Sequence, residues 1–222
     1  MFQHASAFNA DVSTWNTSSV QDMSHLFSGA TAFNGDLSRW NTSAVLNMDN
    51  MFTLATSFNQ DVNSFDVSNV TSMEYMFSGA SGFNQDLNNW NTSSVLSMRS
   101  MFSGATRFNG DVSGWNTSRC SNMRNMFSLA SSFNVDLSAW NVSSVTDMSY
   151  MFSGASAFSG DVSQWQIDRV TTMKFMFSLA ASFNPEIIKS QWRLSPDVDT
   201  HNMFDDISCL TGWLREKRSV LR

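Results

Sequence analysis

The stretch MFSGASGFNQDLNNWNTSSVLSMRS, residues 76–100, decides the fold, because residues 101–125 repeat it as MFSGATRFNGDVSGWNTSRCSNMRN. The pattern fits eight consecutive copies of 25 residues without insertion, beginning at Met1, Leu26, Met51, Met76, Met101, Met126, Met151 and Met176. Such a fixed period is typical of a solenoid, in which each copy buries its apolar side against its neighbours. The sequence therefore predicts an elongated repeat domain over residues 1–184, followed by a non-repetitive segment over residues 185–222.

Each copy contains two kinds of periodicity. Ser68 is a candidate N-cap, and the apolar residues that follow it at helical spacing are Val70, Met73, Met76, Phe77 and Ala80. Trp90 and Thr92 then alternate with polar neighbours, as in a short strand. We therefore predict a leucine-rich-repeat-like α/β solenoid with one short helix and one short strand per repeat and a parallel strand ladder. Because helices stack more widely than strands, the stack should curve with its strands inside; the alternative is that short, tightened helical turns allow a straighter stack.

The carboxyl end departs from the repeat. Pro185 breaks the pattern, and SPDVDTHNMF at residues 195–204 resembles a degenerate repeat turn. Residues at the spacing of one helical face follow, namely Met203, Ile207, Leu210 and Leu214. The sequence therefore predicts a degenerate turn and a capping helix within residues 185–222.

Composition excludes several functions. The chain has 222 residues, a net charge of −6 and only 14% charged residues, so it lacks the basic patch that nucleic acid requires. No apolar run is long enough for a transmembrane segment, and the first residues do not have the pattern of a signal peptide. Seven acids occupy one repeat position, so most of the charge is architectural: Asp11, Asp36, Asp61, Asp86, Asp111, Asp136 and Asp161.

The repeated polar residues favour structural roles over chemistry. The seven aspartates are expected to accept hydrogen bonds from the turn that follows them, with calcium binding as the alternative. A row of asparagines should form a hydrogen-bonded ladder that Ser159 interrupts, and Cys120 should be a buried thiol. Three histidines fall at unrelated repeat positions, His4, His25 and His201. We therefore predict no catalytic, metal or cofactor site and a chain that is not an enzyme.

Specific binding should come from positions at which the copies differ. On the predicted helix side these positions bring aromatic rings beside basic side chains, which is typical of protein contact surfaces, at Tyr75, Arg99, Arg124, Tyr150, Lys174 and Phe175. The alternative is that Glu74 and Arg99 merely pair across copies while the rings lie flat. A second candidate surface is the concave strand face, with Arg39, Asn89 and Gln164.

The copies resemble the 25-residue MFxxAxxFNxDLSxWNTSxVxxM repeats of BspA-like surface proteins over about 183 of the 222 residues. This resemblance implies a leucine-rich-repeat-like solenoid on a cell surface or secreted, with adhesion or protein binding as its function and no catalytic residues. We therefore expect a protein-binding or adhesive scaffold whose partner is another protein. The alternative is an architectural subunit built into a larger assembly, such as an organelle complex.

The amino end leads to a further expectation. Met1 and Phe2 begin a copy without the preceding residues that would cover it. An apolar solenoid edge is normally covered by a cap or a partner. We therefore expect upstream residues or another protein to cover Phe2, Ala5, Phe8, Val12 and Trp15.

Overall fold

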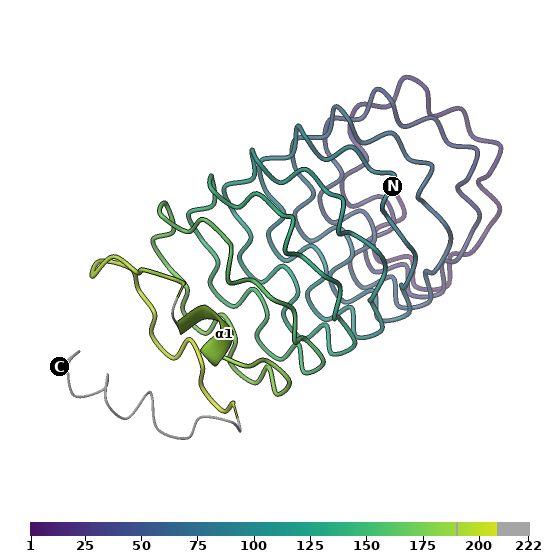
Figure 1. The fold of residues 1–222 in the computed structure, drawn as a ribbon. Helices are drawn as coiled ribbons and strands as arrows, with labels where there is room; N and C mark the ends of the chain where they lie inside the picture. The colour runs from purple at the N-terminus through teal and green to yellow at the C-terminus, as the bar shows by residue number, and fades with distance from the viewer. Residues whose placement is uncertain (190, 208–222) are drawn as a thin grey trace.

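The computed structural model describes residues 1–189 and 191–207. Successive coils of the chain stack along one axis, from the amino end to the helix α1, Glu186–Lys189, at the other end (Figure 1). No other helix and no extended strand occurs in the described part of the chain. The protein is thus a repeat solenoid, and its coils consist mainly of turns.

A parallel ladder joins neighbouring coils, as the sequence predicts. Single parallel bridges recur every 25 residues, for example between Ser72 and Ser97. Along the same edge the backbone N–H of Tyr75 donates to the carbonyl of Arg99 at 2.8 Å, and Phe77 donates to Met101 at 2.8 Å. The ladder therefore lies in the segment predicted to be helical, and the predicted strand position around Trp90 is wrong.

The predicted helix in each copy is replaced by two consecutive turns. Met76 donates to the carbonyl of Met73 at 3.3 Å, and Ala80 donates to the carbonyl of Phe77 at 3.0 Å. The third residue of each turn, Tyr75 or Gly79, has a positive φ of 58° or 68°. A positive φ at that place is the mark of a type II turn and is incompatible with a helix.

The inward pattern nevertheless matches that of a helix. Met73, Met76, Phe77 and Ala80 are all buried, because two successive turns direct the same spacing of residues inward. Trp90 is likewise buried although it lies in no strand. The expected curvature depends on helices stacking more widely than strands. The described residues contain no layer of helices, so this cause of curvature is absent.

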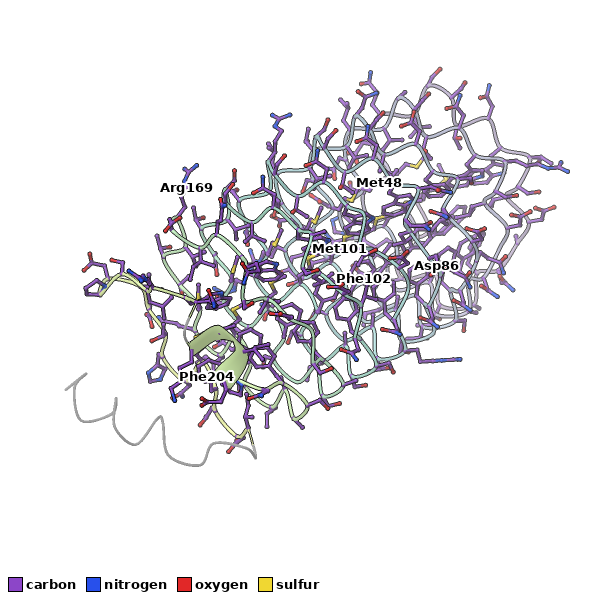
Figure 2. The ribbon with its side chains drawn as sticks, viewed as in Figure 1. Met48, Asp86, Met101, Phe102, Arg169 and Phe204 are labelled. Atoms are coloured by element: carbon purple, nitrogen blue, oxygen red, sulfur yellow. The ribbon has the colours of Figure 1, made fainter. Side chains whose placement is uncertain are left out.

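Aromatic columns fill the interior. Phe102 stacks on the equivalent phenylalanines of its neighbours, Phe77 and Phe127, with ring centroids 5.6 Å apart on each side. Within its own coil it lies 3.9 Å from the ring of Phe108, which belongs to a second column. Figure 2 shows Met101 and Phe102 inside the coil and Arg169 outside it. The phenylalanines at this repeat position therefore form a continuous column through the interior.

Repeated polar bonds hold the other sides of the coils together. The indole N–H of Trp90 donates to the carbonyl of Val62 at 2.9 Å, and the buried hydroxyl of Thr92 donates to Asn116 at 3.0 Å. Each asparagine of the predicted ladder accepts the backbone N–H of the next copy, as Asn59 does from Asn84 at 2.8 Å. The backbone N–H of Ser159 is the last donor, to Asn134 at 2.9 Å, and within the described residues Ser159 accepts no bond from Asn184. The asparagine ladder is therefore confirmed, with its expected break at Ser159.

The predicted degenerate turn continues the stack. Phe177 donates to the carbonyl of Met203 at 2.8 Å and stacks on Phe204 at 5.8 Å. Trp192, although delayed in sequence, donates to Val162 as the other tryptophans do to their neighbours. Met203 lies in a turn, so the capping helix does not begin there; Leu210 and Leu214 lie outside the described residues.

The first coil is less buried than the others. Phe2, Ala5 and Phe8 are half-buried and Trp15 is exposed, whereas the tryptophans of later copies are buried. Val12 is buried, so the expected open edge is wrong at this residue, whose carbonyl also accepts the indole N–H of Trp40. That upstream residues or a partner cover the rest stays a prediction.

Candidate partner-binding surface

The hydrogen-bonded ladder presents one continuous side of the solenoid, which we call the ladder face. After a partial rung at residues 2–4, it consists of eight full rungs, numbered in order, at residues 22–30, 47–55, 72–80, 97–105, 122–130, 147–155, 172–180 and 199–207. In rung 3, for example, Met73, Met76 and Phe77 are buried, whereas Glu74 and Tyr75 are partly exposed. The variable residues that the sequence assigns to a helix side therefore share this face.

Two arginines lie against two tyrosines at the centre of the ladder face. The guanidinium carbon of Arg99, in rung 4, lies 5.4 Å from the ring centroid of Tyr75 in rung 3. The guanidinium carbon of Arg124, in rung 5, lies 5.7 Å from the ring of Tyr150 in rung 6. Both distances are within the range of cation–π attraction. The two basic groups thus occupy adjacent rungs between two aromatic rings.

The remaining predicted residues extend this arrangement toward the carboxyl end. The rings of Tyr150 and Phe175 are stacked with centroids 4.9 Å apart. Lys174 pairs with Asp199 at 2.8 Å, and this contact raises the pKa of Lys174 and lowers the pKa of Asp199. The structure therefore places all six predicted residues on one face, with direct contacts between Arg99 and Tyr75, between Arg124 and Tyr150, and between Tyr150 and Phe175.

The two central arginines have no acidic partner within the described residues. The predicted alternative, a Glu74–Arg99 pair, is not among the ion pairs of the described residues. One carboxylate oxygen of Glu74 instead accepts a hydrogen bond from the Ser97 hydroxyl at 2.6 Å. The Nε atoms of Arg99 and Arg124 are buried without a hydrogen-bond partner. No hydrogen bond or ion pair within the described residues uses the Nη groups of either arginine, so these donors remain available to a partner, whereas the buried Nε atoms are not.

The aromatic residues occupy conformationally costly positions. Tyr75, Tyr150 and Phe175 have φ values of 58°, 60° and 54°, in the left-handed region. This conformation costs most residues with a side chain about 1–2 kcal/mol of conformational free energy. Asparagine adopts it more readily than aromatic residues do. Rungs 2 and 5 have asparagine at this position, Asn50 and Asn125. The turn therefore does not require an aromatic ring.

Sequence reasoning missed a row of exposed leucines on the same face. Of the eight large apolar side chains that are exposed in the described residues, five lie on the ladder face or directly beside it, and these are Leu46, Leu54, Leu96, Leu129 and Leu179. Leu54 and Leu129 are 52% and 56% exposed and have φ values of 57° and 59°. Other copies have glycine there, such as Gly79 and Gly154. Leucine in place of glycine was the signal that could have revealed this row.

The alternative candidate surface is less organised. Arg39, Asn89 and Gln164 are exposed, but they belong to coils two or three copies apart and lie in no strand. No hydrogen bond or ion pair among the described residues joins their side chains to one another. The pKa of Asp36 is lowered chiefly by hydrogen bonds from Ser38 and to a lesser extent by Arg39. This surface therefore contains separate polar groups.

The remaining titratable groups have structural environments. Asp111 accepts the backbone N–H of Ser113 at 2.9 Å, and most of the equivalent aspartates accept the same bond, as expected from the turn. Burial raises the pKa of the Cys120 thiol to about 11, which leaves it protonated at neutral pH. Within residues 1–189 and 191–207, no three His, Cys, Asp or Glu side chains are grouped as metal ligands would be.

The fold and this surface define a class of protein, a repeat solenoid with an aromatic and basic face. The chain belongs to the family described as "Mycoplasma protein of unknown function, DUF285", whose model matches residues 1–115 and 105–214. No catalytic family matches, and no curated protein matches the chain. Among the residues that the structure describes, no helix is long and apolar enough to cross a membrane.

A comparison with solved structures adds one distant likeness. The structure titled "Crystal structure of TLR13-ssRNA13 complex" is 10% identical to this chain, with a TM-score of 0.32. The matched region covers 74% of this chain but only 30% of that chain. A likeness at this level carries no argument about function.

Proposed function

We propose that this protein is a non-enzymatic protein-binding or adhesive repeat scaffold of the BspA-like kind, which acts at a cell surface through its ladder face. The observation that carries the proposal is the pair of arginines, Arg99 and Arg124, which stack on tyrosines but have no acidic partner among the described residues. Exposed leucines surround them on the same face.

The chemistry of this face is that of a contact surface. Tyrosine and arginine are the residues most enriched in the energetically dominant centres of protein interfaces. Stacking on Tyr75 and Tyr150 restricts the guanidiniums before a partner arrives, which reduces the entropy lost on binding. Elsewhere the outer surface is mostly serine, threonine and asparagine, so this combination distinguishes the ladder face from the other sides.

Capture of partners by matched variants tests the proposal. The immobilised full chain is exposed to extract and to intact host or neighbouring cells, and bound protein is quantified for the wild type and for Arg99→Glu/Arg124→Glu. The control Arg107→Glu/Arg169→Glu makes the same charge change at two exposed arginines outside the rungs and outside both candidate surfaces. We expect at least about a tenfold loss of capture only for the first variant, because truncating or reversing a central charged residue costs 2 kcal/mol or more.

The outcomes separate the alternatives. Capture that survives the Arg99→Glu/Arg124→Glu change but fails after Arg39→Glu, or after replacement of Asn89 and Gln164, would assign binding to the other candidate surface. Recovery of one stoichiometric intracellular complex, with no binding to cells, would favour an architectural subunit. Labelling of the chain by a membrane-impermeant reagent on intact producing cells tests the surface location.

A further inference from the structure

We infer that the ladder face of one chain pairs with the ladder face of a second copy, in an antiparallel two-fold dimer. This inference rests on the proposed function, because it names a partner for the same face. It depends on the order of charges along the rungs, on the exposed leucines and on the available area.

The charges along the ladder face are self-complementary. At one position of rungs 2–5 the residues are Asp49, Glu74, Arg99 and Arg124, two acids followed by two bases. A two-fold axis that lies in the interface between rungs 3 and 4, and runs along the rungs, reverses the rung order. It places Glu74 opposite the partner's Arg99 and Asp49 opposite the partner's Arg124, and each pair occurs twice. An isologous interface requires this kind of self-complementary surface.

The acids and bases have unused bonding capacity in the single chain. One carboxylate oxygen of Asp49 accepts the Ser72 hydroxyl at 2.6 Å and the Glu74 N–H at 2.7 Å. One oxygen of Glu74 accepts the Ser97 hydroxyl. The second oxygen of each carboxylate makes no hydrogen bond within the described residues. Serine thus orients each acid and leaves one oxygen for an arginine, and charge-assisted bonds of this kind are the stronger ones.

The same rotation also matches the apolar residues. It exchanges rungs 2 and 5, so Leu54 faces the partner's Leu129, and both leucines are more than half exposed in the single chain. It exchanges rungs 3 and 4, so Gly79 faces the partner's Gly104. Two glycines opposite each other allow the backbones to approach closely. Burial of these leucines in the dimer removes apolar surface from water, and this gain offsets the conformational free energy that their left-handed backbone costs.

The available area is at the lower end of the range for a specific dimer. Rungs 1–6 overlap under this rotation and span roughly 29 Å at a spacing of about 4.8 Å. Each rung contains two turns whose ends lie less than about 7 Å apart, so the face is at most roughly 22 Å wide and the dimer can bury at most about 1,300 Å² in total. Stable specific interfaces bury about 1,200–2,000 Å². A parallel dimer, with its two-fold axis along the solenoid, is disfavoured because it would place the acidic rungs 2 and 3 against the partner's acidic rungs and the basic rungs 4 and 5 against its basic rungs.

The test uses the molar mass of the full chain in dilute solution, measured by light scattering and sedimentation. We expect the wild type to be a dimer, and the single reversals Glu74→Arg and Arg99→Glu each to raise the dissociation constant by about tenfold or more. The double change Glu74→Arg/Arg99→Glu in one chain restores the opposite charges and should restore the dimer. The repeat tolerates either sign, since rungs 3 and 4 differ naturally in this way. Arg169→Glu, a charge reversal at an exposed arginine outside the rungs, should leave the dimer intact.

The results separate this inference from the proposed function. A monomeric wild type at every concentration, or a double reversal that does not restore the dimer weakened by the single changes, overturns the antiparallel dimer. Loss of foreign-protein capture by Arg99→Glu/Arg124→Glu in a monomeric chain would still support the proposed contact surface. An acidic partner would be lost with the arginine reversals but retained or strengthened with Glu74→Arg, whereas the dimer requires both signs.

Discussion

Replacing Phe102 with alanine in the middle of the array perturbs the interior most directly. Phe102 is fully buried and stacks on Phe77, Phe127 and Phe108 at 5.6, 5.6 and 3.9 Å. Phenylalanine-to-alanine changes in a core cost about 3–5 kcal/mol, and stacked aromatic pairs add about 0.5–1.5 kcal/mol each. Because three ring contacts are lost together, we expect a loss near the upper end, about 5 kcal/mol.

Urea unfolding followed by tryptophan fluorescence measures this loss, and Trp115, 6.2 Å from Phe102, lies beside the cavity that the change creates. Phe2→Ala is the matched control, because Phe2 is only half-buried at the end of the column and should cost clearly less. A loss below about 1 kcal/mol for Phe102→Ala would refute the continuous column and the register on which it depends.

Three further predictions concern secondary structure, acid stability and thiol reactivity. Far-ultraviolet circular dichroism should lack a strong helical double minimum, since α1 is the only helix among the described residues; a strongly helical spectrum would support the helix predicted for each copy. The pKa values of Asp36, Asp111 and Asp161 lie below 3.8 because the serine two residues later donates to each carboxylate. As the pH falls, these carboxylates therefore bind protons in the unfolded chain before they do so in the folded chain. The free energy of unfolding should fall as the pH drops below about 4 toward the folded pKa values. An unchanged urea midpoint over this range would contradict the prediction. Cys120, fully buried with a pKa of about 11, should resist a thiol reagent until the chain unfolds, and labelling of its peptide in the native protein would contradict its burial.

The sequence identifies which residues face inward but not the backbone that directs them. Met73, Met76, Phe77 and Ala80 have the spacing of a helical face, and all four are buried. Two consecutive type II turns produce the same spacing, so periodicity alone cannot distinguish them from a helix. At the repeat position of Gly79 and Leu54, some copies have glycine and others leucine, and both residues have a positive φ. The glycines indicate a left-handed backbone only if they are interpreted as a requirement of a turn.

The candidate contact surface was also only partly predictable from the sequence. Variation among copies selects Tyr75, Arg99, Arg124 and Tyr150, and the structure brings these four residues together on adjacent rungs. The direction in which each guanidinium leans depends on three-dimensional neighbours, so the sequence leaves the Glu74–Arg99 pair open as an alternative. The exposed leucines could not be predicted as a surface, because a single exposed leucine is common in proteins. Only the ladder shows that these leucines share one face.

Hydroxyl-radical footprinting of the free chain and of its purified complex tests most directly whether the ladder face is the contact surface. The reaction reports the solvent access of aromatic and leucine side chains, and the ladder face offers Tyr75, Tyr150, Leu54 and Leu129 as probes. Leu194 is an exposed probe away from the ladder face. The account predicts protection of the four ladder-face residues on binding, with no change at Leu194. Unchanged oxidation of the ladder face in a complex that protects other residues would contradict it.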